Sequence, residues 1–330
     1  MSLRALALTL LAAGLALLLL GLCVGSTGLS LEALRGADDV PRAILWEIRL
    51  PRSIGAWLTG ALLGVAGATA QGLFRNPLAD PYLLGASAGA ALGVALVLVG
   101  WGSGAVAASV LARLGMTGAA FAGSVGAMVL TLTLARGAEQ TLRLLLAGVV
   151  VGVVLLAATS VLTLLNPDVL RSMQVFMLGN TALLSGASIA MLLPVLVLAG
   201  SAAYGASRAL DALALGESTA RSLGLPLAGV RFALVGVLAL CTGAAVAQCG
   251  LVAFVGLVAP HLVRGRCGGA HGPLLALSAL AGGALLLSAD ILARGLFAPQ
   301  ELPVGIVTSL LGGVYLLVLM QRGRFGRTAA

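Results

Sequence analysis

The stretch FALVGVLALCTGAAVAQCGLVAFVGLVAPHLV, residues 232–263, contains no Asp, Glu, Lys or Arg. The hydrocarbon core of a bilayer is about 30 Å thick and needs roughly 20 apolar residues per helix, so these residues are too many for one crossing. Gln248, Cys249 and Gly250 interrupt the run with residues that suit a turn. The stretch therefore predicts a full span that ends near residue 249 and a shorter span that begins near residue 251.

The rest of the chain repeats this pattern. Only 9% of the 330 residues are charged and the mean hydropathy is +1.12, which leaves too little polar surface for a water-soluble domain. Eight further charge-free stretches each predict one span: 5–31, 53–74, 82–112, 114–135, 144–165, 172–207, 267–289 and 302–321. The sequence thus predicts an all-α membrane protein of about ten transmembrane helices, built as a single transmembrane domain over residues 1–330. The first span is too long for the apolar core of a signal peptide and is expected to be retained.

The basic residues give the orientation, because cytoplasmic loops of membrane proteins collect Arg and Lys. All 19 basic residues are arginines. With ten spans and both termini in the cytoplasm, twelve arginines lie inside. If 232–263 crossed only once, just eight would lie inside, so the charges favour ten spans. Seven lie outside in the ten-span arrangement: Arg35, Arg42, Arg49, Arg52, Arg113, Arg171 and Arg294.

The absence of lysine also limits the chemistry of the chain. A Walker A loop requires a lysine, so this chain is not expected to bind ATP in that way, and any ATP-driven work would need a partner. The four cysteines show no C-x-x-C spacing and lie in or beside apolar runs, which favours small core residues over metal ligands. We expect no cofactor, no metal site and no catalytic residue in this chain.

The residues leave two classes of protein open, an intramembrane serine protease and an ion-coupled secondary transporter. GASAG at 85–89 fits the nucleophile pattern G-x-S-x-G, and with His261 or His271 as base Ser87 would make the chain an intramembrane serine protease. Asp290 is an acidic residue within a span and could belong to an ion-coupled secondary transporter. Arg294 follows one turn later, however, and favours a local ion pair. Small residues that pack helices are the better explanation of GASAG in so glycine-rich a chain.

One short polar stretch stands out between the apolar runs. ALGESTARSLGLP, residues 214–226, lies in the longest predicted cytoplasmic loop, about 205–231. Glu217 and Arg221 are four residues apart and share one face of any helix. Gly216 and Gly224 mark its two ends, and Pro226 prevents its continuation. The stretch predicts a short capped helix at the membrane surface.

Five motifs in this chain resemble those of the FecCD-type permeases, the membrane subunits of ATP-binding-cassette importers for ferric siderophores, haem and vitamin B12. They are RLPR (49–52), GALLGVAGATAQGLFRNPLADPYLLGASAGAALG (60–93), ALGESTARSLGL (214–225), FVGLVAPHLVR (254–264) and ELPVGIVTSLLGG (301–313). The resemblance implies a type II importer permease fold and import of a metal chelate into the cytoplasm. It also implies a homodimer in the membrane lipid, two cytoplasmic ATPase subunits that carry ATP and Mg, and an outer solute-binding protein.

The resemblance further implies three sets of site residues. The set that docks the binding protein is Arg49, Arg52 and Arg294. The set that forms the cytoplasmic gate is Asn76, Leu78, Thr141 and Leu142. The set that couples the permease to the ATPase is Leu215, Gly216, Glu217, Ala220, Arg221, Leu223 and Gly224.

Overall fold

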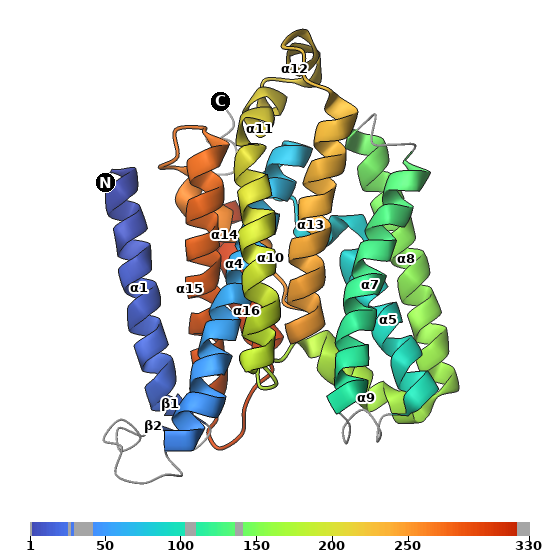
Figure 1. The fold of residues 1–330 in the computed structure, drawn as a ribbon, viewed down its shortest axis with the longest axis vertical. Coiled ribbons are helices and arrows are strands. Elements are labelled where there is room, and N and C mark those ends of the chain that lie inside the picture. The colour runs from blue at the N-terminus through green and yellow to red at the C-terminus, as the bar shows by residue number, and fades with distance from the viewer. Residues whose placement is uncertain (1, 26–27, 30–41, 103–109, 136–140, 322–330) are drawn as a thin grey trace.

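The computed structural model describes residues 2–25, 28–29, 42–102, 110–135 and 141–321 as a bundle of long helices (Figure 1). Two short strands pair antiparallel at one end. The elements in chain order are α1 Leu3–Cys23, β1 Val24–Gly25, β2 Gly28–Leu29, η1 Ile44–Arg49, α4 Leu50–Phe74, η2 Pro81–Leu84, α5 Ala86–Trp101, α7 Val110–Leu134, α8 Thr141–Leu165, α9 Pro167–Leu178, α10 Gly186–Gly205, α11 Ser207–Ala214, α12 Glu217–Ser222, α13 Leu227–Cys249, α14 Val255–Arg264, α15 His271–Gly295 and α16 Val304–Gln321.

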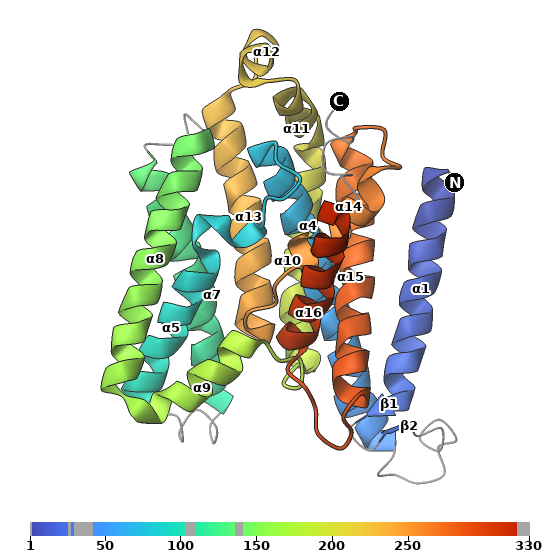
Figure 2. The ribbon, with the colours of Figure 1, turned by 180° about the vertical axis from the view of Figure 1, so that it is seen from behind.

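Eight helices in the described ranges are long and apolar enough to cross a membrane, and α5 and α14 are two shorter apolar helices. Together they match the ten predicted spans. The start of α1, the end of α16 and the short helix α12 all lie at the same end of the bundle, the upper end in Figures 1 and 2. The described chain therefore begins and ends on one side of the bundle, as an even number of crossings requires.

The break predicted within residues 232–263 is confirmed. Helix α13 ends at Cys249, Gly250 adopts a positive φ of 67°, and α14 begins only at Val255. Backbone groups freed inside a bilayer must find partners within the protein. Here the Asn180 amide donates to the Cys249 carbonyl at 2.7 Å, and the Leu251 amide donates to the Phe176 carbonyl at 3.1 Å. The connection between α9 and α10 thus satisfies the backbone at the break.

Two predicted spans have different bounds in the structure. The stretch 172–207 was expected to form one span, but α9 occupies its beginning and ends at Leu178, and the spanning helix α10 starts at Gly186. The expected span within 82–112 is only the 16-residue helix α5. Its start is delayed because Asp80 accepts a hydrogen bond from the Tyr82 amide at 2.8 Å and caps the short helix η2. Turn chemistry, which hydropathy does not register, sets both boundaries.

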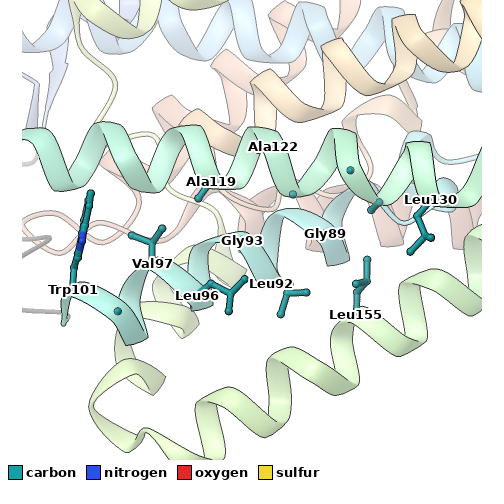
Figure 3. Close-up of a pocket in the computed structure, with 14 residues that line it drawn as sticks. Gly89, Leu92, Gly93, Leu96, Val97, Trp101, Ala119, Ala122, Leu130 and Leu155 are labelled. Carbon is teal, nitrogen blue, oxygen red and sulfur yellow. The ribbon is translucent and has the colours of Figure 1, made fainter.

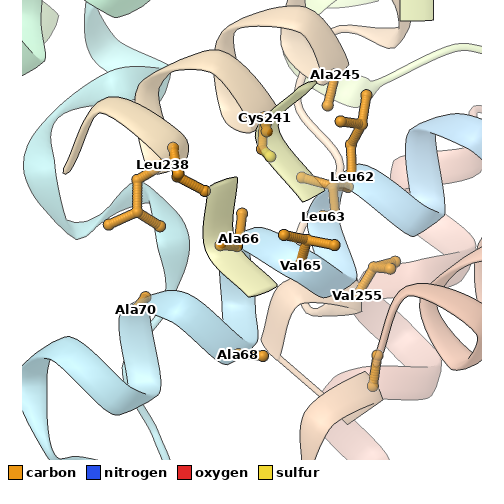
Figure 4. Close-up of a cluster of buried hydrophobic side chains, with 14 of the residues drawn as sticks. Leu62, Leu63, Val65, Ala66, Ala68, Ala70, Leu238, Cys241, Ala245 and Val255 are labelled. Carbon is orange, nitrogen blue, oxygen red and sulfur yellow. The ribbon is translucent and has the colours of Figure 1, made fainter. Parts of the chain in front are cut away.

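Helix α4 lies at the centre of the bundle, and nearly all of its side chains are buried. Figure 4 shows Leu62, Leu63 and Ala66 of this helix with Leu238 and Cys241 of α13 and Val255 of α14, all members of one cluster of buried apolar side chains. This cluster joins the first quarter of the chain to its C-terminal third, so α4 is the element around which the other helices pack.

Glycines allow this close packing. A methyl group added at Gly60 or Gly64 would overlap a backbone carbonyl of α15, and one added at Gly67 would overlap the carbonyl of Gly256 on α14. Gly60 and Gly64 form a G-x-x-x-G pattern, whose small residues let helix backbones approach closely. The backbone of α4 therefore packs directly against the backbones of α15 and α14.

Candidate functional site

Two short helices, α11 and α12, lie at the end of the bundle (Figure 1), and residues 207–224, which comprise them, are called the coupling segment here. The predicted coupling residues lie on α12 and directly beside it. Gly216 has a φ of +112° and precedes α12, while Gly224 has a φ of +80° and follows it. The Gly224 amide donates to the Arg221 carbonyl at 2.9 Å, and the Leu225 amide donates to the Ala220 carbonyl at 3.2 Å. This pair of bonds is a Schellman cap, which glycine favours because it adopts positive φ without strain.

The outward face of this segment combines apolar and basic groups. Leu215 and Leu223 are 69% and 63% exposed, and Arg221 is exposed between them, whereas Ala220 is fully buried against the bundle. Large apolar side chains this exposed outside the spanning helices are typical of a surface that binds another protein. The segment thus has one face fixed to the bundle and one face available to a partner.

Glu217 belongs to the inner face. Its Oε1 atom lies 2.5 Å from the Arg231 guanidinium and 3.9 Å from that of Arg75, and it accepts a hydrogen bond from the Thr141 hydroxyl at 3.0 Å. Among the described residues no ion pair joins Glu217 to Arg221, although their spacing would allow one. The Glu217 carboxylate is therefore paired inside this chain rather than directed outward.

The four predicted gate residues lie near this contact. Thr141 is the first residue of α8, and the exposed Leu142 follows it. Asn76 and Leu78 are exposed in the turn that follows α4, where the Leu78 amide donates to the Asn76 side-chain oxygen at 2.9 Å. Since Arg75 directly precedes Asn76, the structure brings the predicted gate and the predicted coupling segment together at Glu217.

A second contact, which no local pattern in the sequence predicts, holds the coupling segment against the bundle. Asp211 on α11 accepts hydrogen bonds from the His271 backbone amide at 2.8 Å and lies 2.7 Å from Nδ1 of the same residue. His271 is buried at the start of α15. Arg231, Asp211 and His271 were not among the predicted site residues, because their partners are 14 to 90 residues away in the chain.

The three arginines predicted to dock a binding protein lie at the opposite end and are buried. Arg294 is 1% exposed and pairs with Asp290 at 2.6 Å, as its i, i+4 spacing predicted. Arg52 contacts Asp290 at 3.1 Å and Glu301 at 2.8 Å. Arg49 donates to the Leu22 carbonyl at 2.8 Å. Each of the three guanidinium groups therefore has partners inside the bundle. Their docking role stays a prediction.

Several hydroxyl side chains lie inside the bundle. Thr59, Ser124 and Thr242 are fully buried between helices and do not line an open pathway within one copy of the chain. An open groove of about 580 Å³ lies between α5, α7 and α8, with Leu92, Leu96 and Leu155 at its wall (Figure 3). Its lining carries no charged or hydroxyl side chain, so it has no group that would orient a polar solute.

The residues considered as a protease nucleophile or as metal ligands are not arranged for that chemistry. Ser87 lies in the first turn of α5 and follows the short helix η2, so the strand that precedes a hydrolase nucleophile is not there. The four cysteines are free, and three of them are buried. In the described part of the chain no three His, Cys, Asp or Glu side chains are grouped as a metal site would require.

A bundle of apolar spanning helices around a glycine-lined central helix, with a capped polar segment at one end, defines a polytopic membrane protein. The model of the FecCD transport family matches residues 10–322. The chain therefore belongs to the FecCD transport family. It is 41% identical over 315 residues to the hemin transport system permease protein HmuU of Yersinia pestis, with 92% of each chain covered. It is 40% identical over 319 residues to the vitamin B12 import system permease protein BtuC of Escherichia coli, with 93% of this chain and 92% of the relative covered.

Solved structures agree with this assignment. A metal-chelate type ABC transporter in an inward-facing conformation matches with a TM-score of 0.86 and 26% identity, over 97% of this chain and 99% of that one. PsaBC from Streptococcus pneumoniae, at a TM-score of 0.58 and 16% identity over 87% of this chain and 94% of that one, shares the fold. The chain is thus an importer permease subunit and not itself an enzyme.

Proposed function

We propose that this chain forms the membrane pathway of an importer that moves a metal chelate into the bacterial cytoplasm, with energy from a separate ATPase. The observation that carries the proposal is the coupling segment, which is held rigidly by the bundle and leaves Leu215, Arg221 and Leu223 exposed. ATP and Mg would bind to the ATPase partner, since this chain has no lysine for a Walker A loop.

The arginines support an inner-membrane orientation with both termini in the cytoplasm. The end of the bundle that carries α12 also carries Arg75, Arg143 and Arg264, in keeping with the positive-inside rule. A second copy of the chain would complete the pathway, as the resemblance to importer permeases implies. An outer solute-binding protein would deliver the chelate at the opposite end, and lipid would surround the dimer.

The proposed substrate is one of three chelates: a ferric siderophore, haem or cobalamin. Relatives of nearly equal identity are named for hemin transport and for vitamin B12 import, so similarity does not choose between them. Purification of the partner binding protein and measurement of its absorption spectrum with each ligand would decide. A Soret band after haem addition would assign haem.

Reconstitution tests the transport proposal directly. The permease, its ATPase and its binding protein are placed in proteoliposomes, and accumulation of haem, cyanocobalamin and a ferric hydroxamate is measured with ATP inside. We expect vanadate-sensitive accumulation of one of these chelates. Accumulation driven by an ion gradient without ATP would contradict the proposal and favour a secondary transporter.

The Leu223→Asp variant should weaken binding of the ATPase about tenfold or more, because a charge would replace an apolar side chain that a partner must cover. Copurification of the ATPase with the permease in detergent measures this. Leu296→Asp is the matched control, since Leu296 is also exposed but lies at the opposite end of the bundle. Equal loss of ATPase in both variants would show that α12 is not the docking surface.

A further inference from the structure

Glu217 joins three elements that are far apart in the sequence. It is the first residue of α12, and its partners are Arg231 on α13, Thr141 on α8 and Arg75 at the end of α4. Arg231 also donates a hydrogen bond to the Thr141 hydroxyl at 3.1 Å. Glu217, Arg231 and Thr141 therefore form a closed triangle of contacts, with Arg75 at its edge.

The pair with Arg231 is the strongest of these contacts. The Arg231 side chain is 1% exposed and that of Glu217 is 28% exposed, so this pair is largely shielded from water. Arg75 is 42% exposed and lies 3.9 Å away, so water screens its attraction to the carboxylate. Loss of the Glu217 charge would remove the carboxylate that lies against the buried Arg231 in this triangle, and the triangle would lose its strongest contact.

The triangle lies where a movement of α12 could be passed to other helices. The outward side of the same segment carries the exposed Leu215, Arg221 and Leu223, whereas its inward side binds the first residue of α8 and the residue before Asn76. A displacement of α12 would therefore act on the start of α8 and on the turn after α4. Among the described side chains of α12, Glu217 makes both of these contacts, one to Thr141 and one to Arg75.

We infer that Glu217 is a positioning residue that transmits movement of the coupling segment to the cytoplasmic ends of α8 and α4, rather than a contact to the ATPase. This inference rests on the proposed function, since it assigns a task to Glu217 within ATP-driven transport. It separates two roles that the sequence had combined: Arg221 and the exposed leucines bind the partner, and Glu217 converts the partner's movement into a change at the gate.

The Glu217→Gln variant of the complete complex in proteoliposomes tests the inference. Glutamine keeps the size of the side chain and removes the charge that holds Arg231. We expect the ATPase to remain bound and ATP hydrolysis to continue, while the amount of chelate accumulated per ATP hydrolysed falls about tenfold, within the range typical for coupling between sites. Ser218→Ala is the matched control, because Ser218 is exposed on the same short helix, and its ratio should equal that of the unmodified complex.

Thr141→Val provides a second variant that removes only the hydroxyl group of the triangle. It should lower the same ratio about threefold, and the double variant with Glu217→Gln should be no worse than Glu217→Gln alone, because both act through one contact. A role limited to folding would lower the yield of the complex and leave the ratio of accumulation to hydrolysis unchanged.

The outcomes separate the inference from the proposed function. If the unmodified complex accumulates chelate without ATP, the proposed function fails and the inference falls with it. If the unmodified complex is ATP-driven and Glu217→Gln keeps its ratio, the inference alone is overturned. Loss of the ATPase from Glu217→Gln would overturn it in favour of direct docking. If Glu217→Gln yields no complex, an unchanged ratio in Thr141→Val would overturn it.

Discussion

The Asp290→Asn variant is expected to lose about 3–5 kcal/mol of the free energy of unfolding, the usual cost of removing one partner from a buried ion pair. Asp290 is 0% exposed and is the carboxylate between Arg52 and Arg294, at 3.1 Å and 2.6 Å. Asparagine would leave two buried guanidinium groups with only Glu301 as a charged partner among the described residues. Thermal unfolding of the purified permease in detergent, followed by size-exclusion chromatography, measures the loss.

Glu301→Gln is the control for this variant. Glu301 also pairs with Arg52, at 2.8 Å, but its side chain is 26% exposed, so water can replace part of the interaction. Its loss should cost about 1 kcal/mol or less. If both variants unfolded at the same temperature as the unmodified protein, the cluster around Asp290 would not be a source of stability.

The Gly67→Ala variant is expected to prevent correct packing of α14 against α4. The added methyl group would overlap the backbone carbonyl of Gly256, and backbone cannot move aside as a flexible side chain can. Overpacking of this kind costs about 1–3 kcal/mol, and more when backbone must shift. We expect most of the expressed variant to elute as aggregate, measured as the fraction of monodisperse protein after extraction in mild detergent.

Gly118→Ala makes the same chemical change where no atom lies within 4 Å of the new methyl group. Gly118 is exposed on α7, and alanine favours helix over glycine by about 1 kcal/mol. The control should therefore be neutral or slightly stabilising. Equal yields for the two variants would mean that the close contact between Gly67 and Gly256 is not required for the fold.

Much of the fold follows from local features of the sequence. Charge-free stretches predicted the helices, and the polar interruption at 248–250 predicted the break between α13 and α14. Gly216 and Gly224 predicted both ends of α12, because a left-handed backbone at a helix end favours glycine. The exceptions are α5 and the α9–α10 connection, where side-chain and backbone hydrogen bonds in turns move a boundary that hydropathy alone places elsewhere.

The sequence predicted the contacts within the candidate sites less well than it predicted the fold. The resemblance pointed to the coupling and gate positions, but nothing in the spacing of residues indicated that Glu217 meets Thr141 and Arg231. The spacing suggested a partner for Glu217 one helical turn away at Arg221, and a buried arginine on α13 takes that place. At the outer end, the i, i+4 spacing predicted the pair of Arg294 with Asp290, but it could not show that Arg52 contacts the same carboxylate 238 residues further along the chain.

The sequence by itself determined that this chain crosses a membrane about ten times, belongs among importer permeases and must obtain energy from another subunit. These properties depend on hydropathy, on charge counts and on short motifs, which are all local. Only the tertiary structure decided which charges are buried, which face of the coupling segment is free and where the segment touches the predicted gate. Those properties depend on pairs of residues that are distant in the chain. A buried charge needs a charged or hydrogen-bonding partner, and the fold can supply that partner from any part of the sequence.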